Sequence, residues 1–343
     1  MIKNKVGIIG LGYVGLPLSL AFARAKFDVY GFDIDKKKIK ILNNKKSYIK
    51  HIENNTIAKY INKSLFVNND FKDIAKVKLI ILCLPTPLKK NKVPDLSFIK
   101  ITLKNILNFL KPGQIISLES STYPGTTDEI IVEPLMKKFD VGKNFFVVYS
   151  PERENPGDKV SIESIPKVIS GFSKKCLSKG IKLYSEVFNN LIPVKNLKTA
   201  EMTKLLENIY RSVNIGLINE MKIISKKFGL DIYEVINAAK SKPFGFKAFY
   251  PGPGVGGHCI PVDPFYLTWK AKKMGLDTKF IRLAGNINET LPDWITRKVI
   301  KLIPKKNNNK ILIIGVAYKK NVDDYRESPI LKIMKLLEKR KYH

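Results

Sequence analysis

The chain has 343 residues, enough for two domains and part of a third, and 61 basic against 30 acidic residues give it a formal net charge of +31. Its lysines are spread along the whole chain instead of forming one basic stripe. We therefore expect no nucleic-acid partner and attribute the charge to a solvated coat that favours anionic ligands. The sequence contains no apolar run long enough to cross a bilayer, so we also expect no membrane partner.

Cysteine usage points to a reducing compartment. The chain has three cysteines, Cys83, Cys176 and Cys259, too few for the disulfide framework of a secreted domain. The N-terminus leads straight into an apolar strand and does not have the layout of a signal peptide. We therefore expect a cytoplasmic protein.

The N-terminal stretch predicts a strand, a glycine-rich turn, a helix and a second strand that ends in a carboxylate. Gly10 permits the turn, Gly12 lets a pyrophosphate approach, and Gly15 lets the helix pack on the strand. The start of the helix offers free N–H groups for the phosphates. Asp33 should bond ribose hydroxyls and repel a 2′-phosphate, which favours NAD over NADP, although the lysines at 36–38 weaken that preference.

Three further apolar runs, 79–84, 114–118 and 145–149, show no alternation and predict buried strands of a parallel sheet. Each leads into a polar loop rich in proline or glycine, and ligands bind outside the carboxyl ends of such strands. We expect one cleft there, although any one of these side chains taken alone favours the interpretation of a turn former. The three loops carry Thr86, Thr122 and Glu152.

A long helix is predicted from Ala200 to about Lys227, with Thr199 as its N-cap. The helix suits a spine between two domains and a dimer surface. Lys204 and Asn208 lie four residues apart and share one face, which without further context is simply a solvated face. The apolar positions at helical spacing are Leu205, Ile209, Val213, Leu217, Met221 and Ile224.

Residues 251–263 hold four glycines and three prolines, so they predict a tight loop. The loop presents Cys259, and Asp263 is placed to steer a proton or a water beside it. An incidental surface turn is the alternative, although loops held by a scaffold often carry function. Shorter helices are predicted at 231–239, 264–274 and 286–302.

The last segment opens with a polar linker at 305–310, followed by a predicted strand and glycine turn at 311–315 and a helix at 328–341. One strand and one helix cannot bury a core of their own. We therefore expect either that the last domain is cut short or that this piece docks onto the rest of the chain.

The predicted fold class is α/β. An N-terminal Rossmann-type doubly wound parallel sheet spans 1–195. A central all-helical domain with one long helix, which carries the cysteine and the dimer surface, spans 196–304. The start of a second Rossmann-like domain follows at 305–343.

These stretches together resemble the UDP-glucose/GDP-mannose dehydrogenase family over essentially the whole chain. The resembling motifs are GLGYVGLP at 10–17, PTP at 85–87, STYP at 121–124, SPER at 150–153, KLLEN at 204–208, GVGGHCIPVD at 254–263, GVAYKK at 315–320 and RESP at 326–329. The SPERENPGD form at 150–158 looks like the branch that acts on N-acetylated sugars.

The resemblance implies NAD-dependent oxidation of C6 of a UDP-sugar from alcohol to carboxylate, with two NAD⁺ consumed, for cell-surface polysaccharide synthesis. It implies a homodimer and a C-terminal UDP-sugar domain, in which this chain stops early. Cys259 would carry a thiohemiacetal and then a thioester. Lys204 and Asn208 would hold the oxyanion, Asp263 with Thr122 would order water, and Glu152 would activate the hydrolytic water.

The resemblance also implies contacts to both ligands. The cofactor contacts are Gly10, Gly12, Tyr13, Val14, Gly15, Asp33, Lys38, Thr86, Thr122 and Arg326. The substrate contacts are Glu152, Lys204, Asn208, Phe249, Tyr250, Gly256, Gly257, Tyr318 and Lys319. His258 packs the loop, and no His or Cys spacing suits a metal.

Two other functions stay open at this point. A one-step Rossmann dehydrogenase shares the N-terminal domain and the long helix and needs no cysteine. A truncated, inactive homologue would bind NAD only. The identity of the nucleotide sugar is also open.

Overall fold

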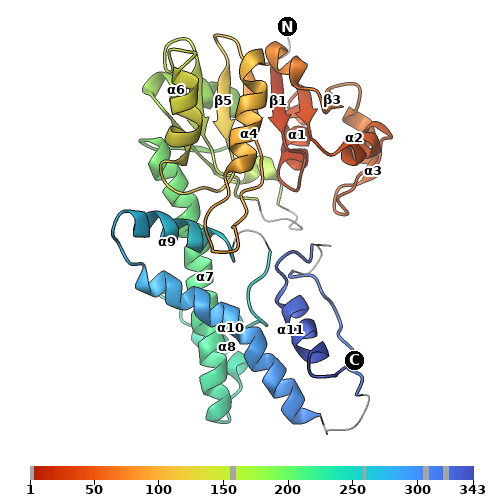
Figure 1. The fold of residues 1–343 in the computed structure, drawn as a ribbon, viewed down its shortest axis with the longest axis vertical. Coiled ribbons are helices and arrows are strands. Elements are labelled where there is room, and N and C mark those ends of the chain that lie inside the picture. The colour runs from red at the N-terminus through yellow and green to blue at the C-terminus, as the bar shows by residue number, and fades with distance from the viewer. Residues whose placement is uncertain (1–3, 155–159, 258–259, 304–308, 320–323) are drawn as a thin grey trace. The chain divides into compact units, whose positions relative to one another are not determined.

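The computed structural model describes residues 4–154, 160–257, 260–303, 309–319 and 324–343 (Figure 1). The chain forms two compact units, residues 1–205 and residues 206–343. The predicted Cys259 lies outside the described residues, as do His258 and Lys320.

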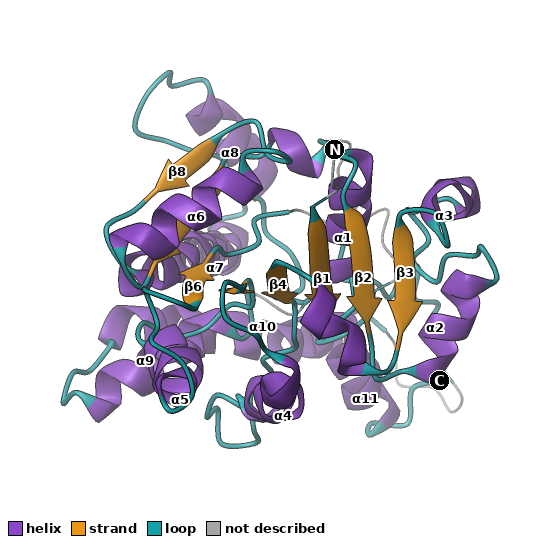
Figure 2. Cartoon of the chain, turned by 90° about the horizontal axis from the view of Figure 1, so that it is seen from above, coloured by secondary structure: helices purple, strands orange, loops and turns teal. Residues whose placement is uncertain are grey.

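The first unit is built on an eight-stranded sheet with the order β3-β2-β1-β4-β5-β6-β7-β8 (Figure 2). All neighbours pair in parallel except β6 and β7, which are antiparallel. The strands are β1 (Lys5–Ile9), β2 (Asp28–Phe32), β3 (Leu65–Asn68), β4 (Leu79–Leu82), β5 (Ile115–Leu118), β6 (Phe146–Tyr149), β7 (Lys167–Gly171) and β8 (Leu191–Pro193). The strand order reverses between β1 and β4, which is where doubly wound sheets bind ligands. The predicted fold class is confirmed.

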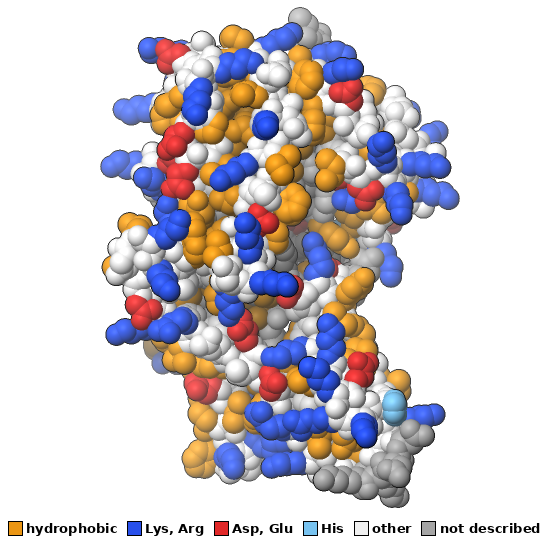
Figure 3. All heavy atoms as spheres, viewed as in Figure 1, with side chains coloured by type: hydrophobic (Ala, Val, Ile, Leu, Met, Phe, Trp, Pro, Cys, Tyr) orange, Lys and Arg blue, Asp and Glu red, His pale blue; other side chains and the backbone are white. Residues whose placement is uncertain are grey.

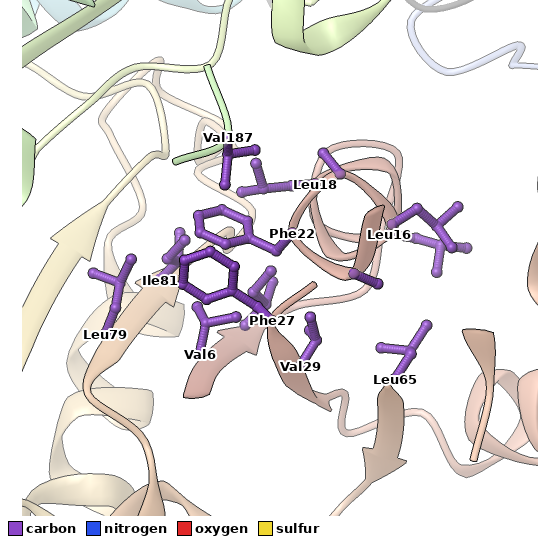
Figure 4. Close-up of a cluster of buried hydrophobic side chains, with 14 of the residues drawn as sticks. Val6, Leu16, Leu18, Phe22, Phe27, Val29, Leu65, Leu79, Ile81 and Val187 are labelled. Atoms are coloured by element: carbon purple, nitrogen blue, oxygen red, sulfur yellow. The ribbon is translucent and has the colours of Figure 1, made fainter. Parts of the chain in front are cut away.

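Helices cover both faces of this sheet, so β4, β5 and β6 are buried throughout. Phe22 of α1 and Phe27 meet edge to face with ring centroids 5.1 Å apart, within a cluster of buried side chains from α1 and the strands (Figure 4). The helices of the unit are α1 (Gly15–Arg24), α2 (Lys36–Asn43), α3 (Asn54–Tyr60), η1 (Phe71–Lys76), α4 (Ser97–Ile106), η2 (Leu107–Phe109), η3 (Asp128–Val132), α5 (Glu133–Met136), η4 (Ile162–Ser164) and α6 (Lys174–Tyr184).

The predicted long helix is α7 (Leu197–Lys227), which has 31 residues. The predicted cap at Thr199 is wrong by three residues. The side chain of Asn196 accepts from both the backbone N–H and the hydroxyl of Thr199 at 2.9 Å, so the helix begins earlier.

The second unit is built from helices. It holds α8 (Ile232–Lys240), α9 (Asp263–Lys273), α10 (Lys279–Leu302) and α11 (Pro329–Glu338). Helix α10 begins at Lys279, before the predicted 286, and continues through Pro292. Ile218 of α7 packs against Ile232 and Ile236 of α8 in one small core.

The strand predicted at 311–315 is wrong, since residues 309–319 form no strand. Leu312 and Ile314 are 85% and 90% exposed, so their side chains face no sheet neighbour. Instead α11 packs on α10, with Ile333 and Leu337 buried in a shared apolar cluster. The end of the chain therefore docks onto the helical unit.

The surface carries lysine and arginine side chains over both units, interspersed with acidic ones on the face shown in Figure 3. Among the described residues, no helix is both long and apolar enough to cross a membrane.

Candidate active site

The glycine-rich turn between β1 and α1 has the geometry that a dinucleotide site needs. Gly10 has φ +94°, and a Cβ there would lie 2.3 Å from the carbonyl oxygen of Cys83. A Cβ on Gly15 would lie 1.8 Å from the carbonyl oxygen of Gly10. A Cβ on Gly12 would meet nothing within 4 Å, so this residue faces open space. Gly10 and Gly15 are therefore required because a side chain at either position would clash with the backbone, and Gly12 leaves room for a diphosphate.

Helix α1 starts at this turn without a competing anion. Its N-cap, Val14, has no side-chain acceptor, and its first turn carries no acidic residue. The positive end of the helix thus remains available to a phosphate. Tyr13, beside the cap, has its ring centroid 6.2 Å from that of His51.

Asp33 follows β2 and is tied to the same turn. Its Oδ2 accepts the backbone N–H of Leu11 at 3.0 Å and the Lys38 ammonium at 3.2 Å. Tyr48, which no sequence motif singles out, donates its hydroxyl to the carbonyl of Leu11. Burial, and then the charge of Asp33, raises the pKa of Tyr48, so it stays a donor. The acid predicted for ribose recognition is therefore held against the turn.

Thr86 and Thr122 occupy neighbouring loops at the strand-order reversal. Ser120 ties the two loops together, since its Oγ donates to the carbonyl of Leu84 at 2.7 Å. Thr86 donates to the carbonyl of Ser121 at 3.0 Å. The hydroxyl of Thr122 is fully buried and has no hydrogen-bond partner among the described residues. Buried polar groups are nearly always paired, so this orphan hydroxyl fits a site that a cofactor or substrate completes.

Glu201 of α7 fixes the loop that carries Thr122. Its Oε2 accepts the N–H of Gly125 at 2.6 Å, and its Oε1 accepts both the N–H and the hydroxyl of Thr127 at 2.8 and 2.7 Å. Burial raises the pKa of Glu201 to about 7. These bonds connect the long helix to the end of the sheet.

Glu152 follows β6 and is bonded at both oxygens. Oε1 accepts the N–H groups of Arg153 and Glu154 at 2.7 Å. Oε2 accepts the Lys167 ammonium at 3.0 Å, and Lys167 also reaches Glu119 at 2.7 Å. The candidate base is therefore held in one orientation.

Lys204 and Asn208 of α7 are 7% and 0% exposed, so the alternative of a solvated face is wrong. The side-chain Nδ2 of Asn208 donates to Oδ2 of Asp263, and the Arg211 guanidinium donates to the side-chain Oδ1 of Asn208. Asp263 is 2% exposed and begins α9. Two of the predicted catalytic residues are thus in direct contact.

The first half of the glycine-rich loop is anchored at two points within the second unit. At its start, Gly252 donates its N–H to Asn219 at 3.1 Å, and Asn219 donates to Asn288 of α10 at 3.0 Å. Midway along the loop, Gly257 has φ +82° and donates its N–H to the carbonyl of Arg326 at 3.0 Å. The backbone that leads to position 259 is therefore fixed by α7, α10 and the C-terminal segment.

Tyr318 packs on the loop's glycines. A Cβ on Gly256 would lie 2.6 Å from the Tyr318 Cβ, and a Cβ on Gly257 would lie 2.9 Å from its ring. Lys319 is half-buried beside it. Arg326, a predicted cofactor contact, forms a two-pronged ion pair with Asp324, with its Nη2 2.6 Å from Oδ2.

Phe249 and Tyr250, predicted substrate contacts, precede the loop. Phe249 is partly buried against the small core of α7 and α8, edge-on to the Tyr210 ring at 5.9 Å. Tyr250 is 46% exposed and stacks on Tyr233 with centroids 6.3 Å apart. Among the described residues, no group of three or more His, Cys, Asp or Glu side chains is placed to hold a metal ion.

Three domains of one family match this chain. The NAD binding domain of the UDP-glucose/GDP-mannose dehydrogenase family matches residues 4–188, its central domain matches 198–290, and its UDP binding domain matches 312–343. The chain belongs to this family. It is an NAD-dependent nucleotide-sugar dehydrogenase, and NAD is confirmed as the predicted cofactor.

Several relatives of this family align over nearly the whole chain. A UDP-N-acetyl-D-mannosamine dehydrogenase of Methanocaldococcus jannaschii is 37% identical over 98% of this chain and 78% of its own length. A UDP-N-acetyl-D-glucosamine 6-dehydrogenase of Pseudomonas aeruginosa is 35% identical over 97% of this chain and 80% of its own. The structure of a UDP-D-ManNAc dehydrogenase from Pyrococcus horikoshii has a TM-score of 0.88 at 33% identity, covering 98% of this chain and 82% of that one.

Sequence reasoning missed Lys167 and Glu119 within this family site. Each was visible only as a charged residue at the end of a buried strand, since Glu119 directly follows β5 and Lys167 is the first residue of β7. Only the pairing of distant strands shows that the two side chains meet.

Proposed function

We propose that this chain oxidises C6 of a UDP-N-acetylhexosamine from alcohol to carboxylate, through a thiohemiacetal and a thioester on Cys259. The buried Asn208–Asp263 contact carries the proposal, because it joins an amide donor of α7 to a carboxylate at the start of α9, the helix that follows the glycine-rich loop. The names of the similar proteins above and the SPERENPGD form support an N-acetylated sugar.

Bound NAD⁺ supplies the hydride acceptor for each of the two oxidations. In the first, water ordered by Asp263 and Thr122 receives the proton of the C6 hydroxyl. The Cys259 thiolate then adds to the aldehyde carbon, and Lys204 and Asn208 stabilise the resulting oxyanion.

The second oxidation turns the thiohemiacetal into a thioester. Glu152 takes a proton from a water, the water oxygen forms a bond to the acyl carbon, and the C–S bond breaks to return the thiolate. Capture on Cys259 keeps the aldehyde bound between the two oxidations, so that it does not escape to solvent.

We propose the division of labour predicted from the sequence: NAD binding by 1–195, catalysis and dimer formation by 196–304, and nucleotide-sugar binding by 305–343 with Tyr318 and Lys319. A stripe of apolar side chains on α7 and the residue after it supports a homodimer, because each is 41% to 76% exposed. The stripe is Met202, Leu206, Tyr210, Leu217, Ile224 and Phe228.

We also propose that the reaction takes place in the cytoplasm and supplies cell-surface polysaccharide synthesis. The thiols of Cys83 and Cys176 are free, which suits a reducing compartment.

The covalent step is tested by mass spectrometry of Glu152→Gln, which should stall at the thioester. After incubation with NAD⁺ and UDP-N-acetylglucosamine or UDP-N-acetylmannosamine, the peptide that contains Cys259 should gain the mass of the acyl-sugar nucleotide. The sugar that loads faster identifies the substrate. An unmodified peptide together with continued product formation would support a one-step dehydrogenase instead.

A further inference from the structure

A cluster of buried charges lies behind Glu152 in the first unit. Glu119 directly follows β5, and Glu152 follows β6. Because β7 runs antiparallel to β6, its first residue, Lys167, lies beyond the carboxyl end of β6. The reversed strand therefore delivers an ammonium group to the edge of the sheet where ligands bind.

The cluster is connected by short bonds. The Lys167 ammonium lies 2.7 Å from Oε2 of Glu119 and 3.0 Å from Oε2 of Glu152. The other oxygen of Glu119 accepts the Tyr184 hydroxyl at 2.6 Å. The ammonium also lies 4.9 Å from the centroid of the Phe188 ring. Lys167 is thus held by an anion, an aromatic ring and the candidate base.

The three charged side chains of this cluster differ in how far they are exposed to solvent. The side chains of Lys167 and Glu119 are 3% and 0% exposed, whereas that of Glu152 is 10% exposed. A buried ion pair costs much desolvation and is weak evidence for a contribution to stability. The Lys167 ammonium bonds Glu152, which is the most exposed of the three side chains. Orientation of the Glu152 carboxylate therefore explains this buried ion pair better than a gain in stability does.

We propose that Lys167, held in place by Glu119 and Tyr184, is a positioning residue that orients the Glu152 carboxylate and stabilises its charged form. The inference rests on the proposed function, in which Glu152 removes a proton from the hydrolytic water. The backbone N–H groups of Arg153 and Glu154 fix one oxygen of Glu152, and Lys167 fixes the other.

The charges around Glu152 agree with this role. Burial raises its pKa, but Lys167 and the two backbone N–H groups outweigh burial, so the pKa lies below its ordinary value. Burial raises the pKa of Glu119 to about 7 and that of Glu154 to about 8. Burial also raises the pKa of the Cys83 thiol, and the Arg153 guanidinium donates to the carbonyl of Pro166. Among the described residues, Lys167 is the cation bonded to Glu152.

The test measures the pH dependence of thioester hydrolysis in the full-length protein. In the plot of hydrolysis rate against pH, the acidic limb is the fall in rate as Glu152 becomes protonated. Lys167→Met should move this limb to higher pH by about one to three units, the shift in carboxyl pKa that an opposite charge at this distance produces. Lys167→Arg should restore the wild-type limb in part. Lys167→Gln keeps a hydrogen-bond donor without the charge and should move the limb upward, as Lys167→Met does. Lys182→Met, an exposed lysine on α6, should leave it unchanged.

A second readout does not depend on turnover. Infrared titration of the unliganded protein identifies the Glu152 carboxyl band as the one that is lost in Glu152→Gln. The pKa of that band should be higher in Lys167→Met and in Lys167→Gln than in the wild type. If both variants titrate Glu152 as the wild type does, the inference is overturned, even if both proteins melt earlier.

The two readouts separate the inference from the proposed function. If the wild type forms no NADH but the infrared band shifts as predicted, the function fails and the positioning role stands. If Lys167→Met does not fold, Lys167→Gln decides: an upward shift supports the role, and an unchanged or downward shift contradicts it.

Discussion

Replacing Thr122 with valine should stabilise the unliganded protein. The Thr122 hydroxyl is fully buried and has no partner in the part of the chain that the structure describes, and a buried polar group left unsatisfied costs about 1–3 kcal/mol. Valine has nearly the same shape and needs no hydrogen bond. We therefore expect the free energy of unfolding in urea, without NAD or substrate, to rise by up to about 1–3 kcal/mol.

Thr126 supplies the matched control, since it lies in the same loop and is equally buried. Its hydroxyl donates to the carbonyl of Tyr123 at 2.7 Å, so Thr126→Val should lower the free energy of unfolding by about 1 kcal/mol. The opposite signs for two buried threonines test the orphan hydroxyl directly. Equal destabilisation by both valines would refute the reasoning.

The same substitution should harm function. If ligands complete the hydrogen bonding of Thr122, then Thr122→Val should lose turnover while it gains stability. It should also gain less melting temperature than the wild type when NAD and nucleotide sugar are added. A variant with wild-type turnover would mean that the hydroxyl serves no ligand.

Three further predictions concern pH, the cysteine loop and the cofactor. The pKa of Glu119 is about 7 against an ordinary 4.5, so between these values the folded state binds more protons and stability falls by about 3 kcal/mol as pH rises. Urea titrations between pH 5 and 8 should therefore show a smaller fall in the free energy of unfolding for Glu119→Gln than for the wild type. An equally steep fall in the variant would contradict the raised pKa of Glu119. Gly257→Ala combines φ +82° with a contact 2.9 Å from the Tyr318 ring. It should therefore lower the melting temperature more than Gly245→Ala, which has φ +70° and open space. A smaller loss of melting temperature in Gly257→Ala than in Gly245→Ala would contradict the packing of Tyr318 on the loop. Asp33→Asn should raise the Kd for NAD⁺ and narrow the preference over NADP⁺ in calorimetry, because a carboxylate repels a 2′-phosphate, and an unchanged preference would remove Asp33 from cofactor selection.

The predictions that the structure confirms rest on patterns among residues that are close together in the sequence. The glycine turn and the buried strands around it depend on residues close in sequence, because glycine is required where backbones touch and continuous apolar runs suit a covered sheet. The long helix was visible for the same reason, since its apolar residues recur at helical spacing over many turns.

The predictions that failed concern local structure that is determined by residues far apart in the sequence. Residues 311–315 have a strand's composition, yet a strand needs a neighbour, and Leu312 and Ile314 remain exposed. The bonds between Lys167 and Glu119 depend on an antiparallel strand pairing that no local pattern specifies. The cap at Asn196 competes with Thr199 three residues later, and propensity alone does not separate two good capping residues.

The most direct test of the central claim is the number of NADH molecules formed per UDP-N-acetylhexosamine consumed. The account predicts about two, because an alcohol becomes a carboxylate in two hydride transfers, and it predicts that Cys259→Ala abolishes the second. One NADH per sugar, unaffected by Cys259→Ala, would contradict the thioester route. NAD binding without NADH from any nucleotide sugar would show that this chain binds the cofactor but does not catalyse the oxidation.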